Sequence, residues 1–563
     1  MIRFLSSIGL FFVLTTNVLA QNPGPNVSWQ KCFSTSKEDY FNSIIKLESG
    51  DYLATMYFGA KDYFLNSDTS TENYLVKFDH NFNVVWKKYI PLYATKIIIL
   101  NDNSFVLAGL TTGWLNKGNI FNDIHGTDQF SADLAILKYD SNAQNVIWAH
   151  AYGSTGAEDQ LFDCIQTSDN GFIFTGKTRG SNGDIPNSRP CFNPFAQDAT
   201  IMKVNSLGAL QWVKMINGSL GDIPSGSIVS LSNDKYKIDI ISNSDDCDFA
   251  GTQPFDLNLS NFKLLTLIIN ENGNEIKRKI DDTGKQFQYI VKSWQKNNRF
   301  YSVGYTLADL AYSPTFPSHD DADGSVAVYD DSLNLISQKL FGGKGYDFFF
   351  DHIYDNTGNH IFFGATASSD NSGDIKNYKG GTSDYWILKT DTNFNIIWSR
   401  TVGSNGMDSY LYYNFPYNKM LINGNELVLA FNIYPPKITP NNDVTCGLYT
   451  THQGDTSVQY PDAWLVAFDL TTGIEIEPIL KSSTFKLFPN PTSNVITVQN
   501  SKPTAKKYKI FITDQLGKIV KEIQYEDTKE FSLSIEDLDN GIYFISVQKN
   551  RKQLFSQKIV IRK

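Results

Sequence analysis

Acidic turns are the residues of this chain whose type and spacing could bind a metal ion. The stretch 370–374 (DNSGD) places Asp370 and Asp374 around a Gly-containing turn. Hard cations such as Ca²⁺ prefer several oxygens from a tight turn, although this one lacks the Glu that completes a calcium-binding loop. The stretch 181–184 (SNGD) repeats the pattern, and 320–323 is a third acidic turn. Calcium at Asp370 and Asp374 is one expectation, and a recurring structural turn is the alternative.

Three further aspartates follow glycines at short, recurring spacings: Asp159, Asp347 and Asp408. They could be ligand carboxylates gathered on one face. The favoured interpretation is structural, because Asp side chains commonly accept hydrogen bonds from nearby backbone N–H groups in turns.

Signatures of enzyme chemistry are missing from the sequence. It has no Gly-x-Ser-x-Gly, no His-Glu-x-x-His and no phosphate-binding glycine loop. The seven histidines include no pair at the i, i+4 spacing of a metal site, and His150 is expected to be packed or at the surface. We therefore predict no catalytic residue and no organic cofactor.

The elements that position these residues repeat about every 60 residues. Seven similar stretches begin the repeats, at 72–86, 133–148, 198–212, 263–277, 323–337, 384–398 and 462–476. In 384–436 and 133–178 each repeat reads as four short strands separated by turns, and helical periodicity is nearly absent. Four strands per repeat of this length indicate the blade of a β-propeller.

A row of tryptophans occupies one slot of the repeat: Trp86, Trp148, Trp212 and Trp398. These rings could stack on a ligand. Because they are in register with the fold, we favour a structural role, in which each ring fills the gap between neighbouring blades.

The two ends of the repeat region complete one another. Residues 29–59 resemble a blade without its first strand, and 462–469 (DAWLVAFD) supply such a strand. We therefore predict an all-β fold with a seven-bladed propeller closed by both chain ends. The segment 474–480 (IEIEPIL) competes with 29–33 for the same slot, and 29–33 is favoured because Trp29 is in the tryptophan register.

Long insertions indicate where a ligand could bind. Residues 180–197, 306–322 and 434–461 are expected to lengthen connections between the fourth strand of one blade and the first of the next. Such connections emerge on one face, and function concentrates on loops.

Charge and leader sequence restrict the compartment and the partners. Residues 1–20 read as a secretory signal peptide, with Arg3, an apolar run and Ala20 at the cleavage site. No transmembrane span is expected in the mature chain. The tail 481–563 has 15 Lys and Arg against 8 Asp and Glu, so the acidic balance of the chain lies in 21–480, which argues against nucleic acid as a partner. Five cysteines leave at least one unpaired, and Cys164 reads as a small buried hydrophobe.

The tail 481–563 changes register and predicts a small antiparallel β-sandwich. Its motifs are 487–491 (LFPNP), 514–517 (DQLG) and 540–543 (NGIY), and the residues singled out are Pro489, Asn490, Pro491, Gly517, Gly541 and Tyr543. The prolines preset a sharp turn, and the glycines are expected to permit positive φ.

These three motifs, in this order before a basic last strand, resemble the type A C-terminal sorting domain of the Bacteroidetes type IX secretion system. The resemblance implies that the type IX machinery recognises residues 481–563 at the outer membrane. It also implies that the domain is commonly cleaved, and that the cargo is then surface-attached or released. An ordinary carbohydrate-binding sandwich is the alternative. The repeats also resemble propeller regions of such cargo.

For the body 21–480 we expect a non-enzymatic module that binds a glycan or a surface protein through its long loops. The alternative is an extracellular polysaccharide-acting hydrolase or lyase, with carboxylates from several blades converging at the central channel.

Overall fold

The computed structural model describes residues 24–33, 35, 38–59, 72–116, 118–125, 131–187, 190–254, 262–282, 289–307, 322–369, 372–403, 408, 419–433, 443, 461–470, 485–500, 507–513, 519–526, 530–549 and 552–563. The chain forms two compact units, Met1–Gly473 and Ile474–Lys563, which are treated separately. The expected signal peptide 1–20 and the expected boundary at 480/481 lie outside the described residues.

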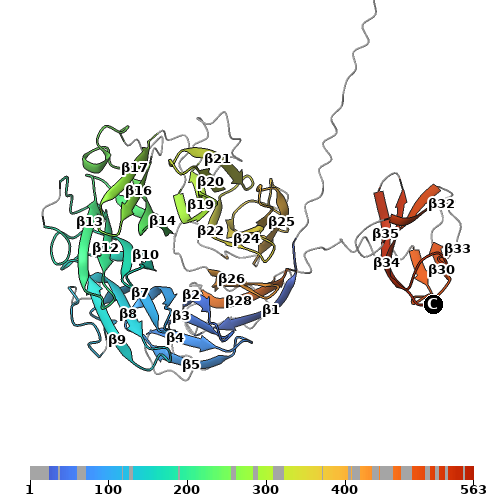
Figure 1. Cartoon of the computed structure of the whole chain (residues 1–563), viewed down its shortest axis with the longest axis horizontal. Helices are drawn as coiled ribbons and strands as arrows, with labels where there is room; N and C mark the ends of the chain where they lie inside the picture. Colours follow the sequence, from blue (N-terminus) through green and yellow to red (C-terminus); the bar gives the residue numbers. More distant parts are fainter. Residues whose placement is uncertain are drawn as a thin grey trace, which may run out of the picture. The chain divides into compact units, whose positions relative to one another are not determined.

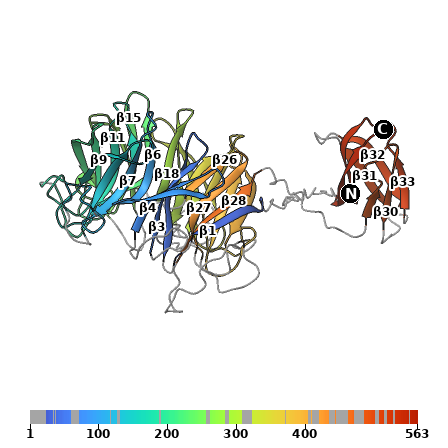
Figure 2. The same cartoon turned by 90° about the horizontal axis from the view of Figure 1, so that it is seen from below.

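In the described part of the first unit, the strands form seven four-stranded antiparallel sheets (Figures 1 and 2). Sheet 1 contains β2 (Asp39–Lys46), β3 (Tyr52–Phe58), β4 (Glu72–Phe78) and β5 (Val84–Tyr89); sheet 2 contains β6 (Tyr93–Ile99), β7 (Phe105–Thr112), β8 (Ala132–Tyr139) and β9 (Val146–Tyr152). Sheet 3 contains β10 (Gln160–Gln166), β11 (Phe172–Thr178), β12 (Asp198–Val204) and β13 (Leu210–Ile216); sheet 4 contains β14 (Asp222–Leu231), β15 (Lys235–Ser242), β16 (Lys263–Asn270) and β17 (Glu275–Asp281). Sheet 5 contains β18 (Tyr289–Lys296), β19 (Arg299–Leu307), β20 (Ala322–Tyr329) and β21 (Leu335–Phe341); sheet 6 contains β22 (Asp347–Tyr354), β23 (His360–Thr366), β24 (Asp384–Thr390) and β25 (Ile396–Val402). Sheet 7 contains β26 (Lys419–Asn423), β27 (Glu426–Ile433), β28 (Asp462–Asp469) and β1 (Val27–Phe33).

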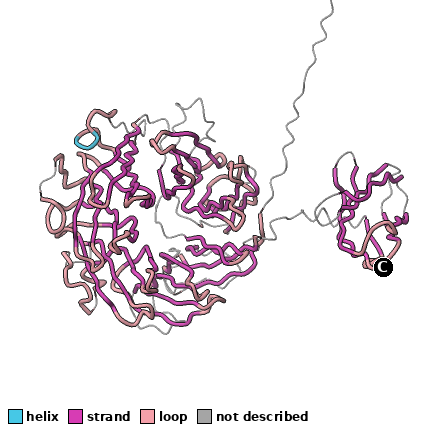
Figure 3. Tube along the Cα trace, viewed as in Figure 1, coloured by secondary structure: helices cyan, strands magenta, loops and turns pink. Residues whose placement is uncertain are grey.

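Helix is almost absent from the described residues, as the sequence predicts. The short 3₁₀ helix η1 (Cys247–Phe249) is the one helical turn among them (Figure 3). The all-β expectation is confirmed.

The middle strands of the sheets are buried on both faces. In β24, for example, six of the seven residues of DYWILKT are buried. Because neighbouring sheets cover both faces of such a strand, its sequence is almost continuously apolar. The outermost strands are partly solvated: Val85 of β5 and Ile147 of β9 are exposed beside a tryptophan that is not.

Consecutive sheets pack against one another in the order of the sequence (Figure 1). The contacts join β2 to β6, β7 to β10, β10 to β14, β14 to β18, β19 to β22 and β22 to β26. The series also joins its own ends, because β2 of sheet 1 contacts β27 and β28 of sheet 7. The first strand of each sheet therefore lies at the inter-sheet contacts.

Both ends of the repeat region share sheet 7, as predicted. Strand β1 pairs antiparallel with β28, with Trp29 opposite Ala467 and Phe33 opposite Ala463. The competing segment 474–480 lies outside the described residues.

The sheets do not coincide with the repeats that the sequence suggests. The four strands expected for 133–178 form, but β8 and β9 belong to sheet 2 whereas β10 and β11 belong to sheet 3. Likewise, the strand 39–46 pairs with 52–58, and 52–58 pairs with β4 rather than with 462–469. The sequence similarity is strongest from the third strand of each sheet onward, so the expected blades are offset by two strands.

The second unit is a small antiparallel β-sandwich, as predicted. One sheet contains β29 (Phe485–Phe488), β30 (Val495–Asn500) and β33 (Glu530–Ser534); the other contains β31 (Lys507–Thr513), β32 (Ile519–Glu526), β34 (Gly541–Lys549) and β35 (Lys552–Ile561). Side chains of both sheets meet in one core, for example Ile496 and Val498 with Ile510 and Ile545.

Candidate functional site

The long connections of the first unit emerge at one edge of the sheets. In a four-stranded antiparallel sheet, the connection from the second to the third strand leaves at the same edge as the connection from the fourth strand to the next sheet. The insertion 180–197 joins β11 to β12 of sheet 3 and lies at this edge, which we call the loop face. It therefore lies within one sheet and not between two, which corrects the sequence-based expectation. Most of 306–322 and 434–461 lies outside the described residues.

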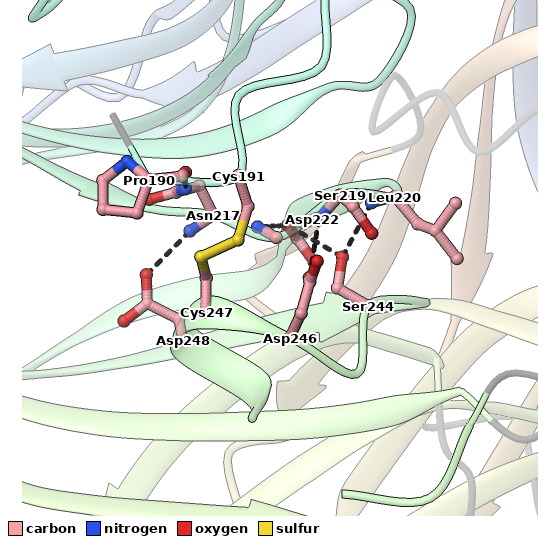
Figure 4. The surroundings of a disulfide bond; sticks show 11 residues. Pro190, Cys191, Asn217, Ser219, Leu220, Asp222, Ser244, Asp246, Cys247 and Asp248 are labelled. Atoms are coloured by element: carbon pink, nitrogen blue, oxygen red, sulfur yellow. Dashed lines mark hydrogen bonds between the residues drawn. A yellow bond between two sulfur atoms is a disulfide. The ribbon is translucent and has the colours of Figure 1, made fainter. Parts of the chain in front are cut away.

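Three neighbouring connections on the loop face are cross-linked, and we call residues 190–197, 217–222 and 244–248 the loop-face cluster (Figure 4). The disulfide Cys191–Cys247 joins the connection of sheet 3 to that of sheet 4, with 6.3 Å between the Cα atoms. Between them, Asn193 Nδ2 donates to the Ser219 carbonyl at 2.8 Å. The Ser219 N–H donates to Asp246 Oδ1 at 2.8 Å. The cluster is thus held in place before any ligand binds.

Large apolar side chains are exposed on these fixed loops. Phe195 is 89% exposed and Leu220 is 40% exposed, both within the loop-face cluster. Trp114, in the connection after β7, is 66% exposed. That connection is also held, since the Asn116 side chain exchanges two hydrogen bonds with the backbone of Phe121. Aromatic rings displayed on rigid loops, beside amide and carboxylate groups, suit ligand stacking.

Ion pairs connect the first strands of neighbouring sheets. Lys96 of β6 lies 2.7 Å from Asp163 of β10, whose second oxygen accepts from the Ile228 N–H of β14 at 2.9 Å. Lys292 of β18 lies 2.6 Å from Asp351 of β22, whose second oxygen accepts from the Met420 N–H of β26. Each aspartate therefore links three successive sheets. These carboxylates are engaged by structural partners, which argues against a role as a free general acid or base.

The three recurring aspartates of the sequence lie at sheet junctions. Asp159 accepts from the Ser154 N–H at 2.6 Å, and Asp347 accepts from the Gly343 N–H at 2.6 Å. Asp408 occupies the equivalent place before sheet 7 and is fully buried. The structural interpretation of Asp159 and Asp347 as turn caps is thus supported by their hydrogen bonds.

Asp374 and Asp184 also contact the preceding sheet. The Asp374 N–H donates to the Gly342 carbonyl at 2.8 Å, and its Oδ2 accepts from the Gly342 N–H at 3.3 Å. Asp184 makes the same two contacts with Gly153. Asp370 lies outside the described residues, among which His, Cys, Asp and Glu form no group of three that could hold a metal ion. Calcium at Asp370 and Asp374 stays a prediction.

The tryptophan row lies between sheets. Trp148 Nε1 donates to the Ser206 carbonyl at 3.1 Å, and Trp212 Nε1 donates to the Glu271 carbonyl at 2.9 Å. Both acceptors lie in the turn between the third and fourth strands of the next sheet. Trp29 likewise packs on Phe82, with ring centroids 4.9 Å apart. The structural interpretation is supported.

A buried histidine pair escaped the sequence reasoning. His352 Nε2 lies 2.9 Å from His360 Nδ1, both residues are 3% exposed, and the Trp294 ring stacks on His352 at 3.9 Å. Burial lowers the pKa of His352 well below its usual value and that of His360 to about 4. Both rings are therefore neutral at physiological pH. The two histidines lie on neighbouring strands of a hairpin, so their spacing in the sequence matches no known metal-binding or catalytic motif.

The cysteines follow the expectation for an exported protein. Cys164 is free and fully buried in the core, as predicted. Besides Cys191 and Cys247, Cys32 is disulfide-bonded. Disulfides persist in oxidising compartments.

The sorting motifs of the second unit meet at its last strand. Asn490 Oδ1, between the cis peptide bonds of Pro489 and Pro491, accepts from the Val560 N–H at 2.9 Å. The Lys563 N–H donates to Asn540 Oδ1 at 2.6 Å, next to Gly541.

Three further residues of the tail motifs are Tyr543, Gly541 and Gly517. Tyr543 packs against the core. Gly541 begins β34 opposite Ile561 and is not among the glycines with positive φ, so the expectation of a turn conformation there is wrong. Gly517 lies outside the described residues.

Residues 486–562 match the family described as the secretion system C-terminal sorting domain. The second unit is therefore a type IX sorting domain, and the protein is secreted to the cell surface or the extracellular space. The match covers the tail, so it identifies the export route and not an activity. No helix among the described residues is long and apolar enough to span a bilayer.

Comparison with curated proteins found no match. Among solved structures, a mutant of Trypanosoma rangeli sialidase displaying trans-sialidase activity aligns over 96% of this chain and 91% of its own, with 7% identity and a TM-score of 0.33. A protein of unknown function from Bacteroides caccae aligns over 58% and 89%, with 9% identity and a TM-score of 0.31. Kuenenia stuttgartiensis hydrazine synthase aligns over 55% and 74%, with 11% identity and a TM-score of 0.32. Likenesses at these scores carry no argument about function.

Proposed function

We propose that residues 27–470 form a seven-bladed β-propeller closed by both chain ends, which the type IX system delivers outside the cell as a non-enzymatic binding module. Support for the closed ring comes from the seven four-stranded sheets, from their sequential contacts, and from the pairing of β1 with β28. Closure would remove exposed sheet edges, which otherwise promote aggregation.

The loop face is the proposed binding surface, and a glycan is the proposed ligand. The observation that carries this proposal is the exposure of Trp114 and Phe195 on loops that are already fixed by a disulfide and side-chain hydrogen bonds. Rigid loops lose little conformational entropy on binding, and aromatic rings bury large area at low cost. The acidic and amide groups nearby could satisfy hydroxyl groups.

Binding of the secreted protein to a glycan array, with Trp114→Ala and Phe195→Ala as variants, tests this function. Removal of an aromatic anchor should weaken binding by about tenfold or more. The control is Leu207→Ala, because Leu207 is similarly exposed at 69% but lies in a turn at the opposite edge. Equal binding by all variants would contradict the loop-face site. If the protein bound surface proteins but no glycan, the ligand would be a protein and not a glycan. Release of sugar from a polysaccharide would favour the hydrolase or lyase.

A further inference from the structure

Pairs of buried aspartates recur at the junctions between sheets. In each pair, one Asp is the first or second residue of the third strand of a sheet, and the other precedes or begins the first strand of the next sheet. The five junction pairs are Asp133 with Asp159, Asp198 with Asp222, Asp323 with Asp347, Asp384 with Asp408, and Asp462 with Asp39. All ten residues are at most 1% exposed.

One backbone hydrogen bond fixes the geometry at four junctions. The N–H of the second Asp donates to the carbonyl of the residue before the first Asp. The observed bonds are Asp39 to Pro461, Asp159 to Ala132, Asp222 to Gln197 and Asp408 to Ser383, at 2.7–3.0 Å. The two carboxyl groups are therefore held side by side by the main chain.

At two junctions a glycine lies against both carboxyl groups of the pair, which shows that the two groups are close together. A Cβ placed on Gly342 would lie 2.5 Å from Asp323 Oδ1 and 2.5 Å from Asp347 Oδ2. Gly153 stands in the same relation to Asp133 and Asp159, at 2.6 and 2.4 Å. Two carboxylates at this separation and burial repel each other, so one proton per pair relieves the repulsion.

Neutral donors face the carboxyl groups of Asp347 and Asp384, and charged groups lie near several pairs. Asp347 faces Thr366, Ser368 Oγ at 2.9 Å and the Gly343 N–H, and Asp374 lies beyond Gly342. Asp384 accepts from the Lys379 N–H, while the Lys379 ammonium pairs with Asp443 at 3.3 Å and Tyr378 lies nearby. The electrostatic neighbours of the other pairs include His125 near Asp133 and Lys263 near Asp222.

We propose that the junction pairs are a pH-sensitive device, in which each pair shares one proton and rising pH weakens the contacts between sheets. Burial, opposed by hydroxyl and N–H donors, raises the pKa of Asp347 and of Asp222 to about 7 and that of Asp159 to about 6. Burial and the neighbouring Asp408 raise the pKa of Asp384. Raised carboxyl pKa values mean that the folded protein binds more protons than the unfolded chain. The stabilisation is complete below the unfolded value near 3.8 and is lost as pH rises through the folded values.

Urea unfolding of the full chain between about pH 4.5 and 8 tests the proposal, since each pair binds its extra proton between the unfolded value near 3.8 and the folded values. Wild type and variants are compared, because the buried histidines act in the opposite direction below about pH 6.5. The folding equilibrium constant should fall by about tenfold per pH unit for each extra proton that the folded protein binds. Asp347→Asn keeps the shape of a protonated carboxyl and should flatten this decline. The control is Asp102→Asn, whose carboxylate is largely exposed beside Lys138 and should leave the decline unchanged.

A second measurement covers the case in which Asp347→Asn does not fold. Unfolding the wild-type chain in weakly buffered urea at about pH 7.5 should release about one proton or more per molecule, since unfolded aspartates are fully ionised there. Net proton uptake on unfolding at this pH, or the same pH dependence of stability in Asp347→Asn as in the wild-type chain, would each overturn the proposal.

Discussion

Individual buried side chains set how the stability of the first unit responds to acid. His352 and His360 contact each other through ring nitrogens, and Trp294 covers one face of His352. Burial disfavours the charged form of either ring, and a second proton would place two N–H groups in this contact. The histidine pair therefore lowers stability as the solution becomes acidic, whereas the junction aspartates act over an overlapping range with the opposite sign.

We predict that the two histidines contribute a loss of stability as pH falls from about 6.5 to 4, each by about tenfold in the folding constant per pH unit, against the opposite contribution of the junction aspartates. The sign follows from the lowered pKa values: the unfolded histidines take up protons near 6.5, whereas the folded His360 does so only near 4. His360→Gln should make the acid decline shallower in urea unfolding curves. His80→Gln, at an exposed position, is the control, and a decline unchanged by His360→Gln would contradict this account.

Residue roles were predictable where a local pattern determines them. The row of tryptophans, the caps at Asp159 and Asp347 and the burial of Cys164 follow from repeat register and composition. At most one member of each junction pair could be singled out from the sequence, for example Asp159. Its partner Asp133 lies in a different sheet, and only the fold brings the two carboxyl groups together. The contact between Asp374 and Gly342 was missed for the same reason.

At the scale of the elements, the cross-linked connections of sheets 3 and 4 keep the loop-face cluster in one arrangement. The disulfide Cys191–Cys247 closes a segment with a sequence separation of 56. In addition, the Asn217 N–H donates to the Asp248 side chain at 2.9 Å (Oδ2), which joins the connection 217–222 to 244–248.

The double variant Cys191→Ser/Cys247→Ser should lower the free energy of unfolding by about 2–4 kcal/mol, because the unfolded chain regains loop entropy. It should also weaken ligand binding at the loop face, while far-UV circular dichroism stays unchanged. Calorimetry measures the first effect. Treatment of wild-type protein with a reductant is not an equivalent test, since it also breaks the disulfide of Cys32. A variant as stable as wild type would show that the hydrogen bonds alone hold the cluster.

Strands were easier to predict than their grouping into sheets. The alternation and apolar runs of 133–178 indicate four strands, and four strands form there. The sequence contains no mark of the sheet boundary, because the turn after Tyr152 resembles the other Gly-containing turns. Which strands pair is decided by contacts between distant segments, such as β4 with β3.

At the scale of the whole molecule, the second unit determines where the protein goes. The motif residues Asn490 and Asn540 each bind the main chain of the last strand or its end, so the sorting motifs depend on the complete sandwich. The position and order of these motifs allowed this assignment from sequence, and the family match agrees with it.

Deletion of residues 485–563 should leave the protein in the periplasm, and immunoblots of periplasmic and extracellular fractions measure this. Lys509→Ala, which changes an exposed side chain outside the motifs, should be exported normally. Appearance of the deletion variant outside the cell would show that another signal directs export.

The pairing of β1 with β28 has a consequence for biosynthesis. Among the described strands of this unit, Val27–Phe33 is the first in chain order and its partner Asp462–Asp469 is the last. Sheet 7 therefore cannot assemble until nearly the whole unit has been synthesised, and contacts so distant in sequence form slowly. A chain in this state stays incompletely folded for longer, so its sheet edges remain exposed until β1 and β28 meet.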